Sequence, residues 1–435
     1  MITQLKKLFY FPIATYFKFF AQIQLSIWKP RIIVVTGSSG KTTLLNLIES
    51  QLQSKAKYSH FANSSYGIPF DILGLKRKNL TLDEWFYLFL AAPFKAFKKP
   101  PKEKLYVVEA DCDRPNEGKF LADLLKPDIT LWTNVSRTHS MNFDYLMSNK
   151  KFSSVEEAIA HEFGYFLEET SDLAIINGDS DLIVKQASRS KAHIKYITQK
   201  NLDDYKVFKD HTEFKIKGKN FSIKALLPKE TFYSIRMTLA LLDFLKIEPD
   251  YTFSKFSLPA GRCSLFNGIK NTTIIDSTYN ATPDGVKAIL NMFNLYPSSK
   301  RWIVLGDMIE LGNEEKEEHE KLADIINKMK LDKIILVGPR LSKAVISSGS
   351  EKSHWDFSVA SLLRNDNTDR IKTFLMPKDA LNYLMQNITG KETILFKGAR
   401  FLEGIIEHLL ADKNDVKKLC RRELVWQNRR RNWGL

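Results

Sequence analysis

Short apolar runs rich in β-branched residues recur along the first half of the chain, and stretches with helical spacing lie between them. The run RIIVVT at 31–36 is followed by a polar turn and then by LLNLIESQL, whose apolar positions recur every three to four residues. Such runs are typical of buried parallel strands, and their alternation with helices predicts an α/β doubly wound sheet. Further strands are expected at 105–110, 128–134 and 173–178.

The pattern changes after residue 200. Short alternating runs at 201–228 predict a small antiparallel flap, and the next stretch, 231–245, predicts a helix. After a break at LPAGR, the strand candidates TTIID, RWIVLGD and KIILVG begin a second α/β alternation, which predicts a Rossmann-like C-terminal domain. We therefore expect an N-terminal segment, a central domain, a C-terminal domain and a tail. Their expected bounds are 1–30, 31–258, 259–412 and 413–435.

Charge is concentrated at the two ends of the chain. The 435 residues include 65 Lys and Arg against 50 Asp and Glu, which gives a net charge of +15. Residues 1–30 hold four lysines and no acid, and residues 413–435 hold eight basic and two acidic residues, so the ends carry ten of the fifteen excess charges. Because the body is only mildly basic, we expect no nucleic-acid groove through the fold.

The N-terminal segment mixes aromatic residues with lysines, and Lys18 interrupts its apolar run, so we expect no cleaved signal peptide. The segment fits either a helix packed on the body or a segment lying on a membrane surface. The basic tail could likewise contact anionic headgroups, at the inner face of the membrane. No run of about 18 apolar residues predicts a spanning helix. The lysine-rich stretch at 94–104 is expected to be an exposed connection.

The turn after the first strand carries the sharpest chemical signal. It reads Gly37-Ser38-Ser39-Gly40-Lys41-Thr42-Thr43. Glycines let successive backbone N–H groups point inward to bind an anion, and the positive end of the following helix adds to the attraction. Lys41 can reach the β- and γ-phosphates, and the Thr42 hydroxyl can bind Mg²⁺. The common Walker spacing would need a glycine at Val35, so an ordinary glycine-rich turn is the alternative. The strand and helix around the loop favour a P-loop ATPase domain.

Further motifs follow in a fixed order along the chain and resemble the Mur ligase family of cell-wall synthesis. The segments are NSSYGIP (63–69), VVEADCDRPNE (107–117), PDITLWTNVSRTHSMNF (127–143), AIINGD (174–179), AGR (260–262), IDSTYNATPDGVKAIL (275–290), VLGDMIELG (304–312) and KGAR (397–400). The last three are similar to the C-terminal domain of the MurF type. The resemblance spans about residues 31–405. It implies an enzyme that uses ATP to activate a carboxylate as an acyl phosphate, which then joins an amine.

The resemblance also implies roles for individual residues near the phosphates. Lys41 and Arg262 would neutralise phosphate charge, and Asn134 would lie at the nucleotide. Mg²⁺ prefers oxygen ligands and accepts the occasional imidazole, and it would be held by Thr42, Glu109 and His139. Each of these residues also has an alternative interpretation. Glu109 could be a surface carboxylate, His139 a loop histidine and Arg262 an ion-pair partner.

The C-terminal domain would contribute the remaining site residues. Asp276 is one of the implied catalytic residues, together with Lys41, Glu109, His139 and Arg262. On the substrate side, the resemblance implies Tyr279, Asn280 and Lys397. By resemblance they would line the side of the incoming amine or the edge of the nucleotide. A structural role in a turn or helix cap is the alternative for Asp276, Tyr279 and Asn280.

The sequence also departs from the family pattern. Only 36 residues precede Gly37, so we expect no UDP-binding domain before the phosphate loop. His161 stands where the family's carboxylated lysine would bridge the metal, and no carbamate can form there. Ser277 replaces one carboxylate of the motif that begins at Asp276, and the helix at 231–245 lacks the asparagine expected at the adenine.

Two functions remain to be compared. We favour an ATP-dependent, ADP-forming ligase that uses Mg²⁺ to join an amino acid or dipeptide to a carboxylate acceptor, such as a cell-wall peptide precursor. The alternative is a P-loop NTPase switch or scaffold without ligase activity. Cys112, Cys263 and Cys420 show no metal-ligand spacing and indicate reduced thiols, which suits a cytoplasmic protein. The sequence leaves open the acceptor, the amine and the oligomeric state.

Overall fold

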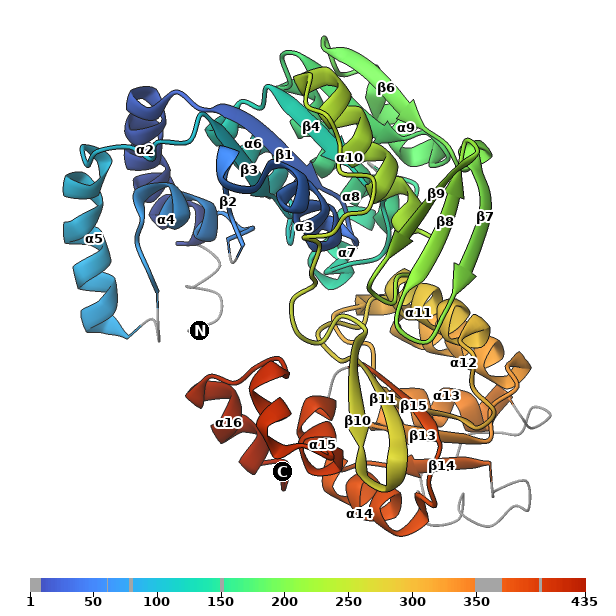
Figure 1. Cartoon of the computed structure of the whole chain (residues 1–435). Coiled ribbons are helices and arrows are strands. Elements are labelled where there is room, and N and C mark those ends of the chain that lie inside the picture. Colours follow the sequence, from blue (N-terminus) through green and yellow to red (C-terminus); the bar gives the residue numbers. More distant parts are fainter. Residues whose placement is uncertain (1–8, 61, 78–80, 149–151, 349–369, 399–400) are drawn as a thin grey trace. The chain divides into compact units, whose positions relative to one another are not determined.

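The computed structural model describes residues 9–60, 62–77, 81–148, 152–348, 370–398 and 401–435 (Figure 1). The chain forms two compact units. The first comprises Met1–Asn201 and Thr231–Phe256, and the second comprises Leu202–Glu230 and Ser257–Leu435. Among the described residues, no helix has the length and apolar character needed to cross a membrane.

A six-stranded sheet in the order β2-β3-β1-β4-β5-β6 forms the centre of the first unit. All of its strand pairs are parallel. The strands are β1 (Arg31–Thr36), β2 (Ala56–Tyr58), β3 (Leu105–Glu109), β4 (Ile129–Trp132), β5 (Leu173–Asn177) and β6 (His193–Ile197). The predictions of β1, β3, β4 and β5 are confirmed, because these strands are buried apolar runs. No prediction was made for β2, which has three residues, or for β6, which is largely outside the core.

Helices precede, connect and follow these strands. They are α2 (Tyr10–Trp28), α3 (Lys41–Leu52), α4 (Gly67–Leu73), α5 (Leu82–Ala96), α6 (Glu117–Leu125), α7 (Asp144–Met147), α8 (Val155–Glu168), α9 (Asp181–Ala187) and α10 (Thr231–Leu245). The N-terminal segment is thus a helix, and Ala14, Phe17 and Ala21 of α2 are fully buried in the core. The expectation that 94–104 is only a connection is wrong at its start, because α5 continues to Ala96.

The second unit holds another six-stranded sheet, in the order β10-β11-β15-β12-β13-β14. Its strands are β10 (Ser264–Gly268), β11 (Thr272–Ser277), β12 (Arg301–Gly306), β13 (Lys333–Val337), β14 (Ile371–Phe374) and β15 (Thr393–Lys397). Only β10 runs antiparallel to its neighbour. The helices are α11 (Pro283–Leu295), α12 (Glu315–Lys328), α13 (Pro339–Ser348), α14 (Pro377–Asn387), α15 (Leu402–Leu409) and α16 (Leu424–Arg431). The expected second α/β alternation is confirmed.

The predicted flap is a three-stranded antiparallel sheet of β7 (Leu202–Val207), β8 (Thr212–Ile216) and β9 (Lys219–Ile223). It groups with the second unit, where the Tyr296 hydroxyl donates to the carbonyl of Lys209. The domain bounds given above remain predictions.

The basic segment 413–435 is folded onto the second unit. It contains the 3₁₀ helix η6 (Lys413–Lys418) and α16. Leu419, Cys420 and Arg430 are buried, and Leu419 belongs to the same apolar cluster as the helix α15. These residues are therefore part of a packed core rather than a free tail.

Candidate functional site

The phosphate loop lies between β1 and α3, at the carboxyl end of the sheet. Gly37 has φ +125°, and a Cβ added there would lie 2.3 Å from Oγ1 of Thr133. Gly40 caps α3 with φ +79°. Both backbone conformations favour glycine. Because β1 is flanked by β3 and β4, the segments that follow these three strands meet at one edge of the sheet, where open α/β sheets bind their ligands.

Asn134, which follows β4, fixes the shape of the loop. Its Oδ1 accepts a hydrogen bond from the Ser39 amide at 2.8 Å, and its Nδ2 donates to Oγ of Ser39 at 2.6 Å. The Ser38 amide donates to the Asn134 carbonyl at 3.1 Å. The predicted cofactor residue Asn134 thus holds the loop from the neighbouring strand.

Lys41 is buried within this loop. Its Nζ donates to the Gly37 carbonyl at 2.6 Å and lies 2.7 Å from Oδ2 of Asp111. Burial lowers the pKa of Lys41, but the carboxylates of Asp111, Glu109 and Asp113 outweigh burial, and the pKa is raised above its ordinary value. Lys41 is therefore a cation held among carboxylates at the position where a phosphate would bind.

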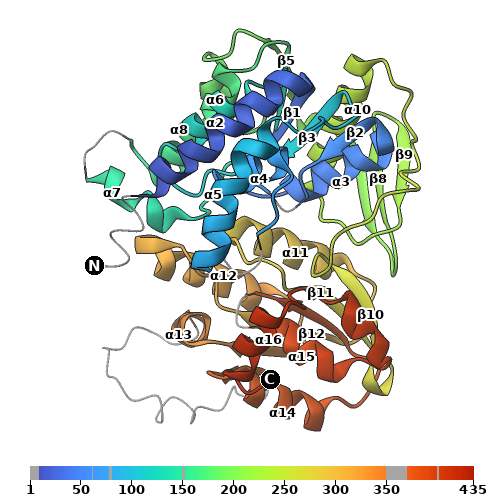
Figure 2. The same cartoon turned by 90° about the vertical axis from the view of Figure 1, so that its left-hand side faces the viewer.

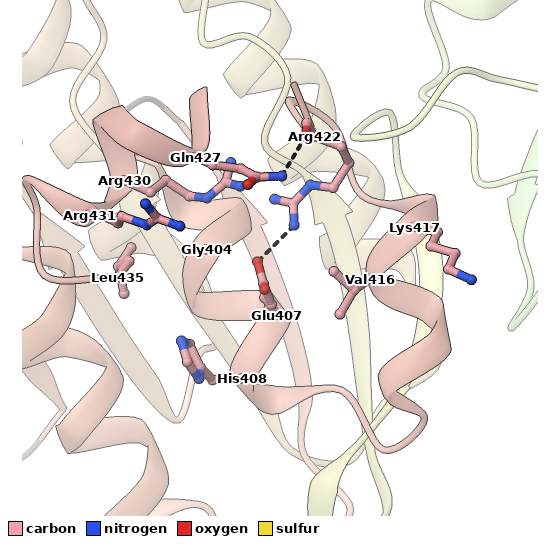
Figure 3. A pocket seen from close by; sticks show the side chains of 10 residues that line it. All are labelled: Gly404, Glu407, His408, Val416, Lys417, Arg422, Gln427, Arg430, Arg431 and Leu435. Atoms are coloured by element: carbon pink, nitrogen blue, oxygen red, sulfur yellow. Dashed lines mark hydrogen bonds and ion pairs between the residues drawn. The ribbon is translucent and has the colours of Figure 1, made fainter. Parts of the chain in front are cut away.

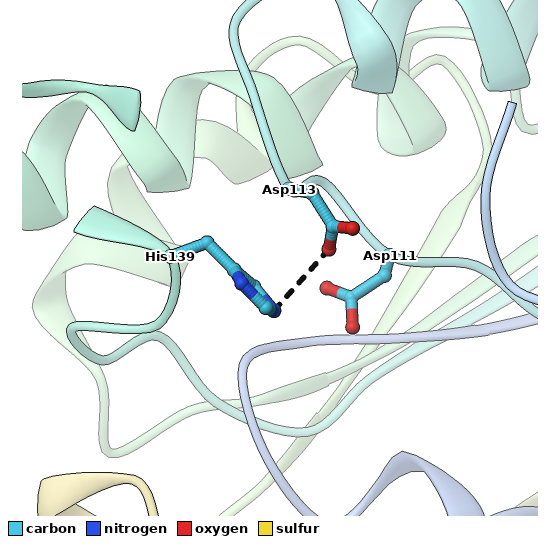
Figure 4. Close-up of side chains that lie close together, drawn as sticks. All are labelled: Asp111, Asp113 and His139. Atoms are coloured by element: carbon cyan, nitrogen blue, oxygen red, sulfur yellow. Dashed lines mark ion pairs between the residues drawn. The ribbon is translucent and has the colours of Figure 1, made fainter. Parts of the chain in front are cut away.

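The end of β3 and the segment after it supply those carboxylates. Oγ1 of Thr42 donates to Oε2 of Glu109 at 2.9 Å, so two of the three predicted metal ligands lie together. The third, His139, lies with Asp113, at 3.3 Å between Nε2 and Oδ1. Asp111 completes this group, because one ligand atom from each of Asp111, Asp113 and His139 lies within 4.8 Å of the others (Figure 4).

Asp111 and Asp113 were missed by the sequence interpretation. The signal was present in EADCD, where an acidic residue stands at every second position after the strand. Burial raises the pKa of Asp113 to about 6, with Asp111 acting in the same direction and His139 opposing it. Two oxygen donors and one imidazole suit a divalent cation such as Mg²⁺.

Two buried glutamates hold the turn that follows. Glu117 accepts hydrogen bonds from the Ser65 amide and hydroxyl and from the Asp113 amide. Glu162 accepts from the amides of Asn116 and Gly118. The positions of the site carboxylates are thus fixed from α6, which begins at Glu117, and from α8, which carries Glu162.

The ring of His161 lies among aromatic side chains. Its centroid is 5.3 Å from that of Phe152 and 5.3 Å from that of Tyr165, whose hydroxyl is 3.4 Å from Nε2. The described carboxylate and imidazole cluster at 111–139 does not include it.

The second unit assembles its own predicted residues around the end of β11. The Arg262 guanidinium lies 4.4 Å from the centroid of the Tyr279 ring. Nζ of Lys397, at the end of β15, donates to the Asn280 carbonyl at 2.5 Å. Asp276 is fully buried, and its Oδ1 accepts hydrogen bonds from the amide and hydroxyl of Thr278. Asp276 therefore shapes the turn that carries Tyr279 and Asn280.

Burial shifts the pKa of two of these groups. Burial lowers the pKa of Lys397 to about 8. Burial raises the pKa of Asp276 to about 6, against the hydrogen bonds from Thr278. Residues 399–400 of the KGAR motif lie outside the described residues.

The C-terminal segment contributes a residue that the sequence interpretation had left in the tail. Arg421 donates to the carbonyls of Thr278 and Tyr279 and pairs with Glu403, which is fully buried. Next to it, a cavity of about 480 Å³ lies between α15, η6 and α16 (Figure 3). Four of its ten lining residues are the basic Lys417, Arg422, Arg430 and Arg431, and Glu407 pairs with Arg422 at 2.7 Å.

Comparison with known families covers both units. The Mur ligase middle domain matches residues 35–240, and the Mur ligase glutamate ligase domain matches residues 261–400. The chain belongs to the Mur ligase family. Together with the relatives described next, this membership makes it an ATP-dependent, ADP-forming ligase that forms amide bonds, and the switch or scaffold alternative is not favoured.

The relatives carry one enzyme name. UDP-N-acetylmuramoyl-tripeptide--D-alanyl-D-alanine ligase of Bacillus subtilis is 25% identical over 392 residues, which cover 87% of this chain and 76% of the relative. The ligase of the same name from Haemophilus influenzae is 25% identical over 86% of this chain and 75% of its own length. The fold matches the crystal structure of MurF ligase from Thermotoga maritima in complex with ADP, with a TM-score of 0.69 at 20% identity over 93% of this chain and 84% of that one.

Proposed function

We propose that this Mur ligase joins an amino acid or dipeptide to the carboxylate of a muramyl-peptide precursor. In the first step a carboxylate oxygen of the acceptor attacks the γ-phosphorus of ATP, and ADP leaves. In the second step the amine attacks the carbonyl carbon of the acyl phosphate, inorganic phosphate leaves, and the amine nitrogen loses a proton. D-alanyl-D-alanine, named in the relatives, is the first amine to test.

The phosphate loop supports the nucleotide end of this reaction. Its glycine conformations and the start of α3 provide backbone N–H groups for phosphate oxygens. Lys41 would leave Asp111 to bind the β- and γ-phosphates. Positioning and charge neutralisation are the main demands of phosphoryl transfer, and both fit a buried lysine in a fixed loop.

The donor set fits magnesium. Thr42 and Glu109 offer oxygen atoms beside the loop, and Asp111, Asp113 and His139 offer two carboxylates and an imidazole. Bound Mg²⁺ would neutralise phosphate charge. The chain's own contribution is to hold these donors through the buried Glu117 and Glu162.

For the second unit we propose binding and positioning roles. Arg262 and Lys397 would supply positive charge to the phosphates and the carboxylate acceptor. Tyr279 and Asn280 would contact the amine substrate. Asp276 would act as a positioning residue, since it is fully buried and hydrogen-bonded to Thr278.

The location of the enzyme is a finer proposal. ATP and free dipeptides are cytoplasmic, so we place the enzyme there. The termini are one candidate for peripheral contact with an anionic membrane, and vesicle binding by Arg429→Gln/Arg431→Gln tests them.

The observation that best supports this function is the ion pair of Lys41 with Asp111 inside a glycine loop, beside carboxylates that can hold a cation. The test offers UDP-linked and lipid-linked muramyl peptides with D-alanyl-D-alanine or single amino acids, and measures ADP release and product mass. We expect one ADP per new amide, and no product with Lys41→Met. ATP hydrolysis without any amide product across this screen would contradict the proposal.

A further inference from the structure

Helix α5 carries a row of large apolar side chains that face solvent. They are Leu82 (90% exposed), Phe86 (67%), Tyr87 (57%), Leu90 (55%) and Phe94 (80%), followed directly by Phe97 (69%). Residues three and four positions apart share one side of a helix, so Leu82, Phe86 and Leu90 form a continuous stripe with the phenylalanines after them. Single exposed apolar residues are ordinary, whereas a contiguous row of this kind marks an interaction surface.

The opposite side of α5 is already occupied. Leu88, Ala92 and Ala96 are fully buried. The Tyr16 hydroxyl of α2 donates to the Phe89 carbonyl at 2.7 Å, and α2 and α5 lie side by side in the first unit (Figures 1 and 2). The helix is thus fixed to the body by one apolar side and presents a second apolar side outward. Because a helix that is apolar on all sides is normally buried, the outward side of α5 is expected to bind a further apolar surface.

Positive charge follows the stripe directly. Residues 94–104 contain five lysines and a single acid, Glu103. Four of the lysines are exposed, namely Lys98, Lys99, Lys102 and Lys104. Asp83 and Glu84 stand at the other end, in the first turn of α5. Aromatic rings beside lysines are the composition of segments that rest in the headgroup layer, since the rings reach the acyl boundary and the ammonium groups remain at the phosphates.

We propose that α5 and the lysines after it dock this protein on an anionic lipid surface. The helix would lie in the plane of the membrane, because its 15 residues are too short for a hydrocarbon core that needs about 20. The stripe of Leu82, Phe86, Leu90 and Phe94 enters the acyl boundary, and Lys98 and Lys99 bind headgroup phosphates. This surface is separate from the two termini and does not depend on the ligase reaction.

The experiment is vesicle flotation of the full chain without ATP. Vesicles of phosphatidylcholine alone are compared with vesicles containing roughly a third phosphatidylglycerol. We expect binding to the anionic vesicles that weakens as salt increases. Phe86→Ser/Leu90→Ser/Phe94→Ser should abolish it, and Lys98→Gln/Lys99→Gln should weaken it by about fivefold for each lysine.

Two matched controls isolate the surface. Leu295→Ser/Leu375→Ser/Met385→Ser removes three exposed apolar side chains from the second unit, and Arg429→Gln/Arg431→Gln removes two exposed charges from α16. Both should bind vesicles like the wild type. Circular dichroism and amide formation with soluble substrates, measured on every variant, separate loss of docking from loss of folding or of the ligase activity.

Three results would overturn the proposal. They are no binding of the full chain to anionic vesicles, equal binding by the α5 triple variant, and binding lost only with the α16 variant. Light scattering tests whether a second copy of the chain binds the stripe instead of lipid. A dimer that the α5 triple variant dissociates, without vesicle binding by the wild type, would assign the stripe to a second copy of the chain.

Discussion

Nζ of Lys41 lies 2.7 Å from Oδ2 of Asp111, inside the loop that would receive the phosphates of ATP. The lysine is therefore neutralised by the protein before any nucleotide binds. A phosphate must compete with the Asp111 carboxylate for the same ammonium group. This competition has consequences for affinity and for stability that can be measured separately.

Asp111→Asn should tighten nucleotide binding in the absence of divalent cations. Removal of the Asp111 carboxylate frees Lys41 and removes a negative charge that would repel the phosphates. We therefore expect the Kd for ADP in EDTA to fall about tenfold. Isothermal titration calorimetry measures this change. Asp181→Asn, an exposed acid of α9 in the same unit, is the control. Weaker binding by Asp111→Asn in EDTA would contradict the competition.

Lys41→Met should destabilise the first unit as well as prevent nucleotide binding. It leaves the buried Asp111 carboxylate without its cation, and breaking a buried pair from one side costs about 3 to 5 kcal/mol. Lys41→Met/Asp111→Asn should regain most of this loss in urea denaturation, yet still fail to bind ADP. If the double variant were no more stable than the single one, the ion pair would not be the cause.

Asp113→Asn and His139→Gln should raise the Mg²⁺ concentration needed for half-maximal ADP release by tenfold or more. Each change removes one ligand from the cluster of Asp111, Asp113 and His139. Because burial raises the pKa of Asp113 to about 6, the wild-type requirement for Mg²⁺ should also increase as the pH falls below 6. An unchanged Mg²⁺ dependence in both variants would place the cation elsewhere.

The contribution of Lys397 to the free energy of unfolding should increase as the pH rises from 7.5 to 9.5. Burial lowers the pKa of Lys397 to about 8 in the folded state, below the unfolded value of about 10.4. The unfolded chain therefore binds more protons in this window, and the free energy of unfolding increases by about 2 kcal/mol across it. Urea titrations at both pH values should show this increment in the difference between the wild type and Lys397→Met, because the buried cysteines with raised pKa values oppose it equally in both proteins.

Arg421→Gln should impair amine use, although Arg421 belongs to the basic C-terminal segment. The guanidinium holds the carbonyls of Thr278 and Tyr279 and pairs with buried Glu403. We expect the KM for the amine to rise at least tenfold and the free energy of unfolding to fall by about 1 to 3 kcal/mol. Arg429→Gln in α16 removes the same charge from a guanidinium that, like that of Arg421, lies over the Trp426 ring, and it should leave both quantities unchanged.

Local patterns determined much of the fold. The buried runs that became β1, β3, β4 and β5 are apolar over most of their length, and the helix predicted at 231–245 has those bounds in the structure. These features depend on side chains close together in the sequence. The short β2 and the exposed β6 have little apolar signal of their own and are strands because β3 and β5 pair with them.

The sequence by itself placed the phosphate loop, because the glycines that allow its positive φ angles and the start of α3 lie within GSSGKTT. Only the tertiary structure decided which acids surround Lys41. The strand order places β3 and β4 on either side of β1, and this brings Asp111, Asp113 and His139 to the loop from separate segments. The folding of residues 413–435 was decided in the same way, since Arg421 and Arg430 meet their partner Glu403 only when α15 and α16 pack together.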